Sequence, residues 1–366
     1  MTNALTADDL GLRAACSRWL SSHGPTRVKE VLAALGHVTE ADLPADFYGM
    51  GGAVEQLEHR SAALLGKEGA TFVIKGMIAQ TALLRTVTEA RRGAVVIPTF
   101  GHMAIDEARA VHHLIDAEVI ELGGDAGFTA EDLEGLGRPV AACVVELPVR
   151  RAAYQLLPLS ELRRISDWCR KNQVHFHIDG ARLWEAAASY GADLADLGAL
   201  ADTVYVSFYK GLGGLAGAAL AGDRELLGRL QVWKKRFGGD VNTAFPFALS
   251  ALDGLDKRLP RMPAYLDRAR KLAAAFADRG FQTVPAVPHV NAFQVILPGE
   301  PADLMAATRG FAHRRGIWLF NAFIPAGDPD RSRTEIVIGD AAEHYSDDEA
   351  VSWVEELLRQ DPAVSS

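Results

Sequence analysis

The chain has 366 residues, of which 49% are hydrophobic and 23% charged, and its formal net charge is -9. This length and hydrophobic fraction allow a large buried core, either in two domains or in one large domain with a smaller partner. The charge is spread along the chain without a long Lys/Arg block, so we expect neither nucleic acid nor a membrane as a partner.

The cysteines indicate a reducing compartment. Cys16, Cys143 and Cys169 cannot all pair, and they lack the spacing of metal ligands. We therefore expect a cytoplasmic protein without a bound metal. We also expect no signal peptide, transit segment or membrane-spanning helix, because no apolar run of about twenty residues occurs.

Changes of pattern along the chain predict three parts. Residues 1–40 form a helix-rich N-terminal arm, residues 41–250 a large domain and residues 251–366 a small C-terminal domain. In the arm, amphipathic helices are predicted from Asp8 to Leu20 and from Arg27 to Leu35, with a Gly-Pro break between them.

The first part of the large domain contains two Gly-rich turns. Residues 46–58 are a polar loop that leads into a helix, and Gly76 marks the turn from a short strand into an apolar helix that ends near Thr88. A Gly at such a turn exposes backbone N–H groups, which together with the helix dipole suit a phosphate group.

Strands and helices alternate from residue 70 to residue 222. A strand from Ala94 to Pro98 precedes His102, and the apolar run Val140 to Val145 is typical of a strand buried on both faces. A helix follows, for which we expect Ser160 as the N-cap. The alternation predicts an α/β fold with a mostly parallel sheet and right-handed crossovers.

The stretch from residue 175 to residue 217 carries the strongest chemical signal. His175, His177 and Asp179 share one face of a short strand, because side chains alternate along a strand. Asp179 is therefore delivered at the carboxyl end of that strand. Arg182 follows three residues later, at the start of an Ala-rich helix.

A second buried strand, Thr203 to Phe208, is followed by Lys210 and a Gly-rich loop. Open α/β sheets bind ligands outside the carboxyl ends of their strands, so Asp179 and Lys210 should border one crevice. A lysine amine can form a Schiff base with pyridoxal 5'-phosphate, and an acidic partner keeps the pyridine nitrogen protonated. The pair therefore predicts this cofactor. Taken alone, an Asp at a strand end is more typical of a turn or a helix cap, and a Lys beside glycines is usually exposed to solvent.

Two motifs resemble those of a known family. The segment 177–184, HIDGARLW, and the segment 207–212, SFYKGL, resemble the HxDGAR and S-x-x-KG signatures of the threonine aldolase and β-eliminating lyase family. The resemblance implies the aspartate-aminotransferase-like arrangement, called fold type I, with a three-layer, mostly parallel sheet and a smaller α+β C-terminal domain. It also implies a homodimer or homotetramer with shared active sites.

The resemblance assigns roles around the cofactor. Asp179 is expected to pair with the pyridine nitrogen, Arg182 to contact the phenolic oxygen and Lys210 to hold the cofactor covalently. His102 is similar to the histidine that stacks on the cofactor ring and takes part in catalysis.

The phosphate site resembles the family only partly. The run from Lys75 to Gln80 is similar to S-G-T-x-A-N, so the backbone amides of Gly76 and Met77 are expected to hold the phosphate. Met77 replaces the family's hydroxyl residue, and Ser207 is the candidate to supply a hydroxyl instead.

The substrate-binding residues are less closely matched. Tyr48 lies in a segment similar to D-x-Y-G-x-D-P-T-V, and Ser22 lies near the place of a serine that reaches the substrate carboxylate; a Gly-rich connection and a plain turn are the alternatives. The family's carboxylate-binding Arg is replaced by Glu335. Arg333 or Arg331 would then bind the carboxylate, unless they form a solvated loop or the substrate is not an ordinary α-amino acid.

The resemblance implies a lyase acting on a small amino acid. The expected reaction cleaves the Cα–Cβ bond of a β-hydroxy-α-amino acid, such as threonine or phenylserine, to glycine and an aldehyde. Other reactions of the same cofactor, β-elimination or transamination, and a non-catalytic cofactor-binding protein are the alternatives.

Overall fold

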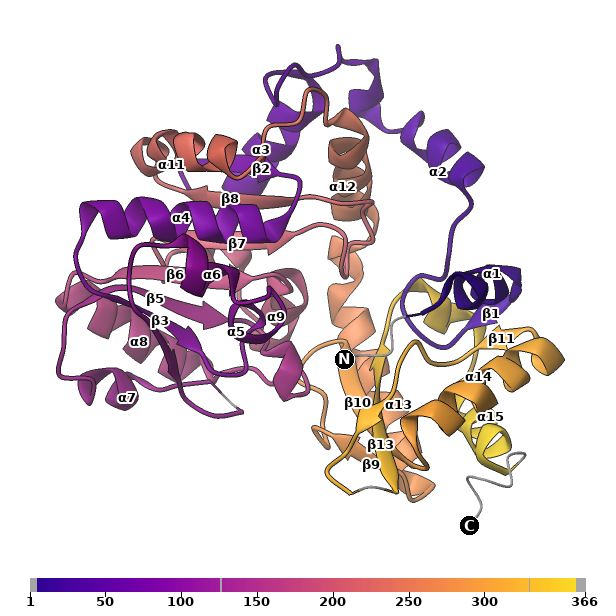
Figure 1. Cartoon of the computed structure of the whole chain (residues 1–366). Helices are drawn as coiled ribbons and strands as arrows, with labels where there is room; N and C mark the ends of the chain where they lie inside the picture. Colours follow the sequence, from indigo (N-terminus) through magenta and orange to yellow (C-terminus); the bar gives the residue numbers. More distant parts are fainter. Residues whose placement is uncertain (1–4, 126, 329, 360–366) are drawn as a thin grey trace. The chain divides into compact units, whose positions relative to one another are not determined.

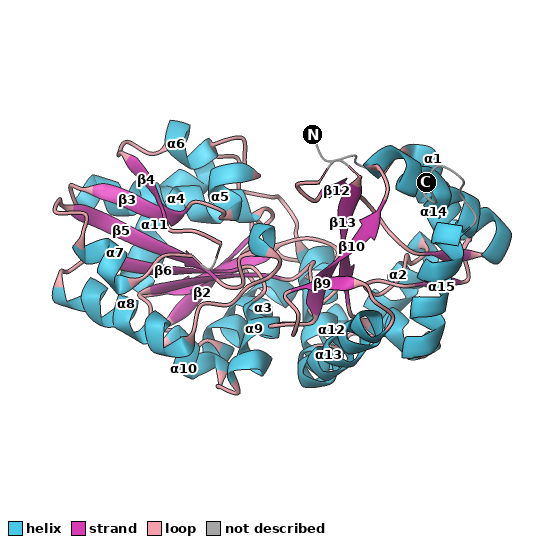
Figure 2. Cartoon of the chain, turned by 90° about the horizontal axis from the view of Figure 1, so that it is seen from below, coloured by secondary structure: helices cyan, strands magenta, loops and turns pink. Residues whose placement is uncertain are grey.

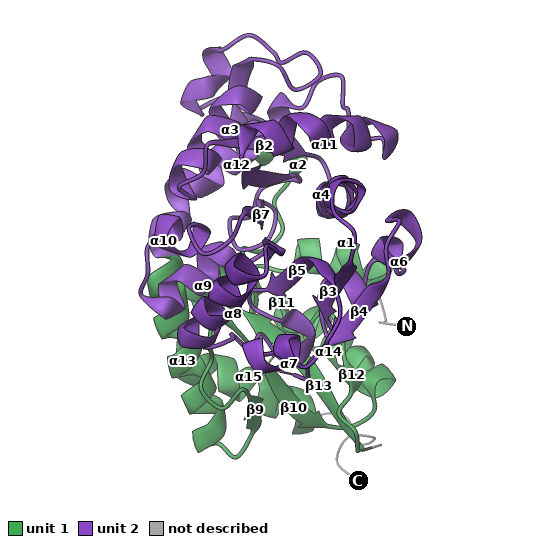
Figure 3. Ribbon diagram, turned by 90° about the vertical axis from the view of Figure 1, so that its left-hand side faces the viewer, with its two compact units in different colours: residues 1–31, 262–366 green, residues 32–261 purple. Residues whose placement is uncertain are grey.

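The computed structural model describes residues 5–125, 127–328 and 330–359. The chain divides into two compact units, one formed by residues 32–261 and the other by residues 1–31 together with residues 262–366 (Figure 3). We call them the large unit and the small unit, and each is described by itself. Helix α2 (Val28–Leu35) crosses the boundary between them.

A seven-stranded sheet forms the centre of the large unit, in the order β2-β8-β7-β6-β5-β3-β4. Its strands β4, β3, β5, β6 and β7 pair in parallel, whereas β8 is antiparallel to both β7 and β2. The predicted mostly parallel sheet is therefore confirmed. The strands are β2 (Gly69–Val73), β3 (Ala94–Pro98), β4 (Val119–Leu122), β5 (Val140–Glu146), β6 (His175–Gly180), β7 (Thr203–Ser207) and β8 (Ala218–Gly222).

Helices cover both faces of this sheet and give three layers (Figures 1 and 3). Helices α4 and α11 pack against each other on one face, and α8, α9 and α10 lie on the opposite face. The helices are α3 (Gly52–Leu64), α4 (Gly76–Ala90), α5 (His102–Ile105), α6 (Ala110–Leu114), α7 (Ala130–Glu134), α8 (Leu159–Lys171), α9 (Leu183–Tyr190), α10 (Leu194–Gly198), α11 (Arg224–Arg236) and α12 (Phe245–Lys257).

The layer between α4 and the sheet is mainly apolar. Side chains such as Ile97, Val144 and Leu220 pack there into one buried cluster. In the middle of the sheet, however, β6 and β7 place His177 and Thr203 in the same layer, and both are completely buried. Polar groups inside an apolar layer are costly unless they form hydrogen bonds, so these two side chains require partners within the layer.

The N-terminus of α8 corrects one prediction. The helix begins at Leu159, and its N-cap is Pro158 rather than Ser160. The carbonyl oxygen of Pro158 accepts hydrogen bonds from the backbone amides of Glu161 and Leu162, so Ser160 lies inside the first turn.

Asp46 anchors the loop that precedes α3. Its buried carboxylate accepts hydrogen bonds from the backbone amides of Ala244 at 2.9 Å, Phe245 at 2.8 Å and Gly49 at 3.2 Å. Asp46 therefore caps α12 from a distant part of the sequence and holds the loop that carries Tyr48 against the start of that helix.

The small unit is α+β, as predicted for the C-terminal domain, and it also includes residues 1–31 (Figure 2). A four-stranded antiparallel sheet has the order β12-β13-β10-β9, and β1 pairs in parallel with β11. The elements are α1 (Ala7–Ala15), β1 (Arg18–Trp19), α13 (Met262–Asp278), β9 (Gln282–Val284), β10 (Ala292–Pro298), α14 (Pro301–Arg315), β11 (Ile317–Trp318), β12 (Ile324–Pro325), β13 (Arg331–Val337) and α15 (Asp347–Arg359).

An ion pair joins the two chain segments that form the small unit. Asp9 of α1 lies 2.6 Å from the Nε atom of Arg309 in α14. The hydrogen bond from Arg309 holds the pKa of Asp9 well below its usual value. Residues near the N-terminus are therefore an integral part of this unit.

The three cysteines, Cys16, Cys143 and Cys169, are free and buried. None of the helices in the described part of the chain is both long enough and apolar enough to span a membrane.

Candidate active site

The carboxyl ends of three parallel strands bring the motif residues together. The register pairs Asp179 of β6 with Glu146 of β5 on one side and with Tyr205 of β7 on the other. The chain then turns at Gly180, where a Cβ atom would lie only 2.7 Å from the carbonyl oxygen of Tyr205. The absence of a side chain at Gly180 is thus what allows this close turn after Asp179.

Asp179 is a buried carboxylate held by neutral donors. Its Oδ2 atom accepts a hydrogen bond from Nε2 of Gln80 at 3.0 Å, and Oδ1 accepts one from the backbone amide of Ala181 at 3.2 Å. Burial raises the pKa of Asp179, whereas Lys210, His102 and Gln80 act to lower it. Among residues 5–125, 127–328 and 330–359, no cation forms an ion pair with Asp179, so a cationic ligand group would stabilise the carboxylate.

Lys210 follows β7 and is partly buried. Burial and the positive charge of Arg182 lower its pKa to about 8, while Asp179, Glu146 and Glu185 act in the opposite direction. Part of the amine is therefore neutral near physiological pH, as a nucleophilic lysine requires.

The two motif segments are bonded to each other. The indole Nε1 of Trp184 donates to the carbonyl oxygen of Ser207 at 2.9 Å, and the hydroxyl of Ser207 donates to the carbonyl oxygen of Ala181 at 3.0 Å. The guanidinium of Arg182 lies 5.1 Å from the centre of the Tyr154 ring. The hydroxyl hydrogen of Ser207 is thus directed to the backbone after Asp179.

His102 begins the short helix α5, and two carboxylates hold it. Its backbone amide donates to Glu146 at 2.6 Å, and its Nδ1 atom lies 3.1 Å from Oε1 of Glu107. The hydrogen bond to Glu107 raises the pKa of His102. Sequence reasoning missed Glu107, because its spacing of five residues from His102 is not one at which residues of a helix face each other.

Two further buried carboxyl groups lie at the site. Burial, followed by the charge of Asp179, raises the pKa of Glu146 to about 7. Burial also raises the pKa of Glu185, which lies so close to Gly211 that a Cβ atom there would be 2.3 Å from Oε1. A charged residue within the Ala-rich segment of α9 was the only sequence signal for Glu185.

The N-terminus of α4 provides a place for an anion. The N-cap of α4 is Lys75, whose side chain forms no capping hydrogen bond, so the first-turn amides at Gly76 and Met77 are available to a ligand. A Cβ atom at residue 76 would lie 2.0 Å from the hydroxyl oxygen of Tyr205. Glycine is therefore required at this position.

The predicted substrate residues lie in both units. Tyr48 is exposed in the large unit, with a φ of 49°. In the small unit, the backbone amide of Ser22 donates to Val337 of β13 at 2.7 Å. β13 starts at Arg331, earlier than the predicted Thr334, so Arg333 shares a face with Glu335, and the buried Nε atom of Arg333 has no hydrogen-bond partner among the described residues.

These residues fit pyridoxal 5'-phosphate. Lys210 is an amine with a lowered pKa, Asp179 is a buried carboxylate without an ion-paired cation, and α4 begins with uncapped amides at a glycine. They match the aldehyde, the ring nitrogen and the phosphate of the cofactor, respectively.

Comparison with known proteins supports this assignment. The model of the β-eliminating lyase family matches residues 30–297. The aldolase VrtJ of Penicillium aethiopicum is 33% identical over 51% of this chain and 50% of its own length, and the low-specificity L-threonine aldolase of Candida albicans is 25% identical over 62% and 63%. The chain thus spans about half to two thirds of these relatives.

The structural match extends over nearly the whole chain. The crystal structure of a proposed L-allo-threonine aldolase from Listeria monocytogenes EGD-E is 31% identical in sequence and has a TM-score of 0.87. The match covers 96% of this chain and 98% of that one.

The charges around Lys210 make a testable prediction. In the cofactor-free protein, acetylation of Lys210 should increase with pH around a midpoint of about 8, because only the neutral amine reacts. Arg182→Gln should raise the midpoint, since a positive charge is removed, and Asp179→Asn should lower it. Competitive labelling with acetic anhydride and peptide mass spectrometry would measure these midpoints.

The exposed Lys257 serves as the internal reference in this experiment. A Lys210 midpoint at the ordinary lysine value of 10.5, or shifts of the same sign in both variants, would contradict the electrostatic account.

Proposed function

Since the chain belongs to the β-eliminating lyase family, we propose that it is a pyridoxal 5'-phosphate-dependent lyase acting on a β-hydroxy-α-amino acid. The proposed reaction cleaves the Cα–Cβ bond of a threonine-like substrate and releases glycine and an aldehyde. The observation that carries the proposal is the placement of Asp179 at the end of β6 and of Lys210 just after the neighbouring β7, with uncapped amides at the start of α4, the helix whose Gln80 bonds to Asp179. When bound, the cofactor supplies an electron sink for the bond that breaks at the α-carbon.

We assign the cofactor contacts as follows. Lys210 holds the aldehyde carbon covalently, and Asp179 keeps the ring nitrogen protonated. The backbone amides of Gly76 and Met77 bind the phosphate, and Arg182 contacts the phenolic oxygen. Ser207 supports the site by holding the turn after Asp179 through its bond to Ala181.

His102 is the proposed base for the β-hydroxyl proton. Glu107 bonds to Nδ1, which leaves Nε2 as the ring nitrogen that can take a proton from substrate. The same bond raises the pKa of His102, so the imidazole is a stronger base than an isolated histidine.

Arg333, Ser22 and Tyr48 are the proposed contacts to the amino-acid substrate. The unpartnered Nε atom of Arg333 supports a ligand-binding role, because a buried guanidinium nitrogen without an acceptor is costly. Arg331 and Glu335 lie on the same face of β13, so a carboxylate bound by Arg333 has both signs of charge nearby.

The activity is tested directly by product analysis. The purified protein with pyridoxal phosphate, incubated with threonine or phenylserine, should release glycine and aldehyde in equal amounts. Borohydride reduction and peptide mapping should label Lys210, and Lys210→Ala should abolish both the label and the aldehyde. A keto acid without aldehyde would instead indicate transamination or β-elimination, and no product at all would favour a non-catalytic protein.

Arg333 can be compared with a matched neighbour. Arg333→Ala should lower kcat/KM for the amino-acid substrate about 10- to 100-fold, as expected when a charge-assisted hydrogen bond is lost, with the cofactor retained. Arg331→Ala, on the same face of β13, should have little effect. The opposite result would assign the carboxylate to Arg331.

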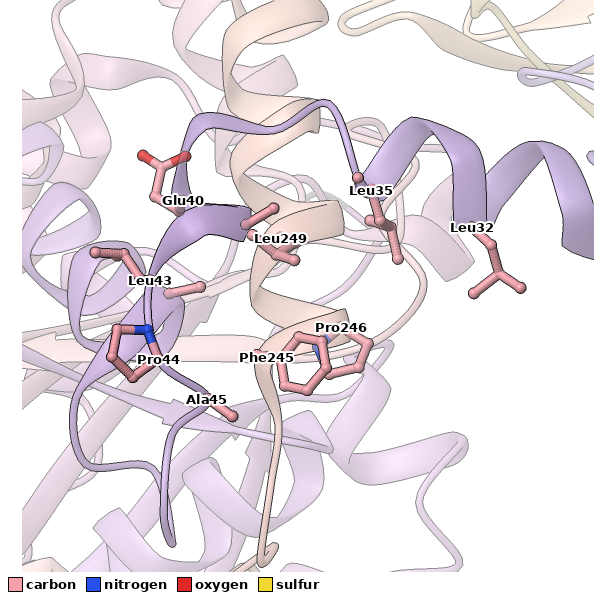
Figure 4. Close-up of a pocket in the computed structure, with 12 residues that line it drawn as sticks. Leu32, Leu35, Glu40, Leu43, Pro44, Ala45, Phe245, Pro246 and Leu249 are labelled. Carbon is pink, nitrogen blue, oxygen red and sulfur yellow. The ribbon is translucent and has the colours of Figure 1, made fainter.

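The exposed apolar residues support a homo-oligomer. Phe47 and Met50 are 61% and 67% exposed, and they flank Tyr48 in the loop anchored by Asp46. A groove of about 360 Å³ in the same unit is lined mainly by apolar residues of α2, the segment 40–45 and the start of α12, including Leu35, Leu43, Phe245 and Leu249 (Figure 4). We propose that this surface contacts a second copy of the chain, in a homodimer or homotetramer.

Sedimentation analysis tests the oligomer. The parent should sediment as a dimer or tetramer, and the double variant Phe47→Ser with Met50→Ser should shift toward the monomer. Val287→Ser removes a comparably exposed apolar side chain from the small unit, and it should change nothing. A monomeric parent would refute the proposal.

A further inference from the structure

A chain of hydrogen-bonding side chains runs behind Asp179, between α4 and the sheet. The parallel register places Thr203 of β7 beside His177 of β6. The hydroxyl of Thr203 lies 2.9 Å from Nε2 of His175 and 2.9 Å from Nδ1 of His177. One hydroxyl therefore joins two imidazoles that share a face of β6.

The chain continues to the proposed cofactor site. Nε2 of His177 lies 3.4 Å from Oε1 of Gln80 in α4, and Nε2 of Gln80 donates to Oδ2 of Asp179 at 3.0 Å. Gln80, His177, Asp179 and Thr203 are each at most 2% exposed. Water therefore does not replace the protein partners at these four positions.

The directions of these hydrogen bonds follow from Asp179. An ionised carboxylate only accepts, so Gln80 must present its NH₂ group to Asp179 and its oxygen to His177. His177 must then carry its proton on Nε2, and its Nδ1 must accept from the hydroxyl of Thr203. The oxygen of Thr203 in turn accepts from Nε2–H of His175, so every hydrogen points toward Asp179.

The protonation states of the two imidazoles are consistent with this direction. Burial lowers the pKa of His175 to about 4 and that of His177 to about 3, so both are neutral at physiological pH. The carboxylate of Asp202 lies 3.9 Å from Nδ1 of His175, beyond a hydrogen bond, and acts to raise the pKa of His175, whereas Arg91 and Lys67 act to lower it. A neutral imidazole with one donor and one acceptor is what the chain requires.

We propose that Thr203, His177 and Gln80 are positioning residues, which together form a one-directional hydrogen-bond relay that holds the Asp179 carboxylate for the cofactor. The relay fixes the orientation of the Gln80 amide, because a rotated amide would face the carboxylate with its oxygen and His177 with its NH₂ group. Aligned hydrogen bonds also polarise one another, which strengthens the donor at Asp179. The relay rests on the cofactor role of Asp179 proposed above.

The tautomers of the two histidines test the relay without cofactor or activity. In ¹⁵N-histidine-labelled, cofactor-free protein, the imidazole nitrogen shifts should show both His175 and His177 as neutral Nε2–H tautomers. The assignments come from single His→Gln variants. An Nδ1–H tautomer or a cationic ring at His177 would overturn the relay.

Thr203 provides a change that removes the hydroxyl and keeps the shape. Thr203→Val should remove the hydrogen bond to Nδ1 of His177 and so change the Nδ1 chemical shift, while Gln80 keeps the proton on Nε2. It should also weaken pyridoxal phosphate binding about tenfold, because buried groups lose their partners. Thr203→Ser should restore both. Thr81→Val is the matched control, since Thr81 adjoins Gln80, is buried and has an Oγ1 atom without a partner among the described residues.

Each outcome decides a separate claim. An unchanged Nδ1 shift of His177 together with unchanged cofactor affinity in Thr203→Val, or an equal loss in Thr81→Val, would refute the relay. If Thr203→Val does not fold, the tautomers of the parent protein still decide. A parent that does not bind pyridoxal phosphate would defeat the proposed function, while the tautomers would still report whether the hydrogen bonds run in the inferred direction.

Discussion

One carboxylate inside an apolar layer is the constraint on which the site depends. Asp179 lies at the end of a central strand, where burial disfavours its charge. The charges of Lys210 and His102 act against this effect of burial, as does the hydrogen bond from Gln80 of α4, and the backbone amide of Ala181 after β6 supplies a further donor. The parallel register sets Thr203 beside His177, and these two side chains continue the hydrogen bonds that begin at Asp179. The pairing of the strands therefore determines which groups support the carboxylate.

Two groups at the strand ends have pKa values close to physiological pH. Lys210 has a pKa lowered to about 8, and Glu146 one raised to about 7. Both groups can therefore exchange protons near physiological pH at little cost in free energy. Arg182 opposes the charge of Lys210, whereas the carboxyl groups favour it, so a change at one residue shifts the protonation of the others.

Much of the fold could be predicted from sequence, because apolar strands and helices alternate with regular spacing and two motifs lie at strand ends. The sheet, the three layers and the α+β small unit are confirmed, while the roles of Lys210, Asp179 and Arg333 stay predictions. Gln80, Glu107 and Glu185 were not predicted as site residues. Their roles depend on contacts made through the fold, such as the 99 positions that separate Gln80 from Asp179, and spacing along one chain does not report such contacts.

The discontinuous small unit has a consequence for synthesis on the ribosome. β1 pairs with β11, and Asp9 pairs with Arg309, so these residues bind partners that are translated about three hundred residues later. The large unit, residues 32–261, is by contrast contiguous. Vectorial translation therefore favours folding of the large unit first, whereas the segment before residue 32 lacks its partners until the residues after 261 have left the exit tunnel.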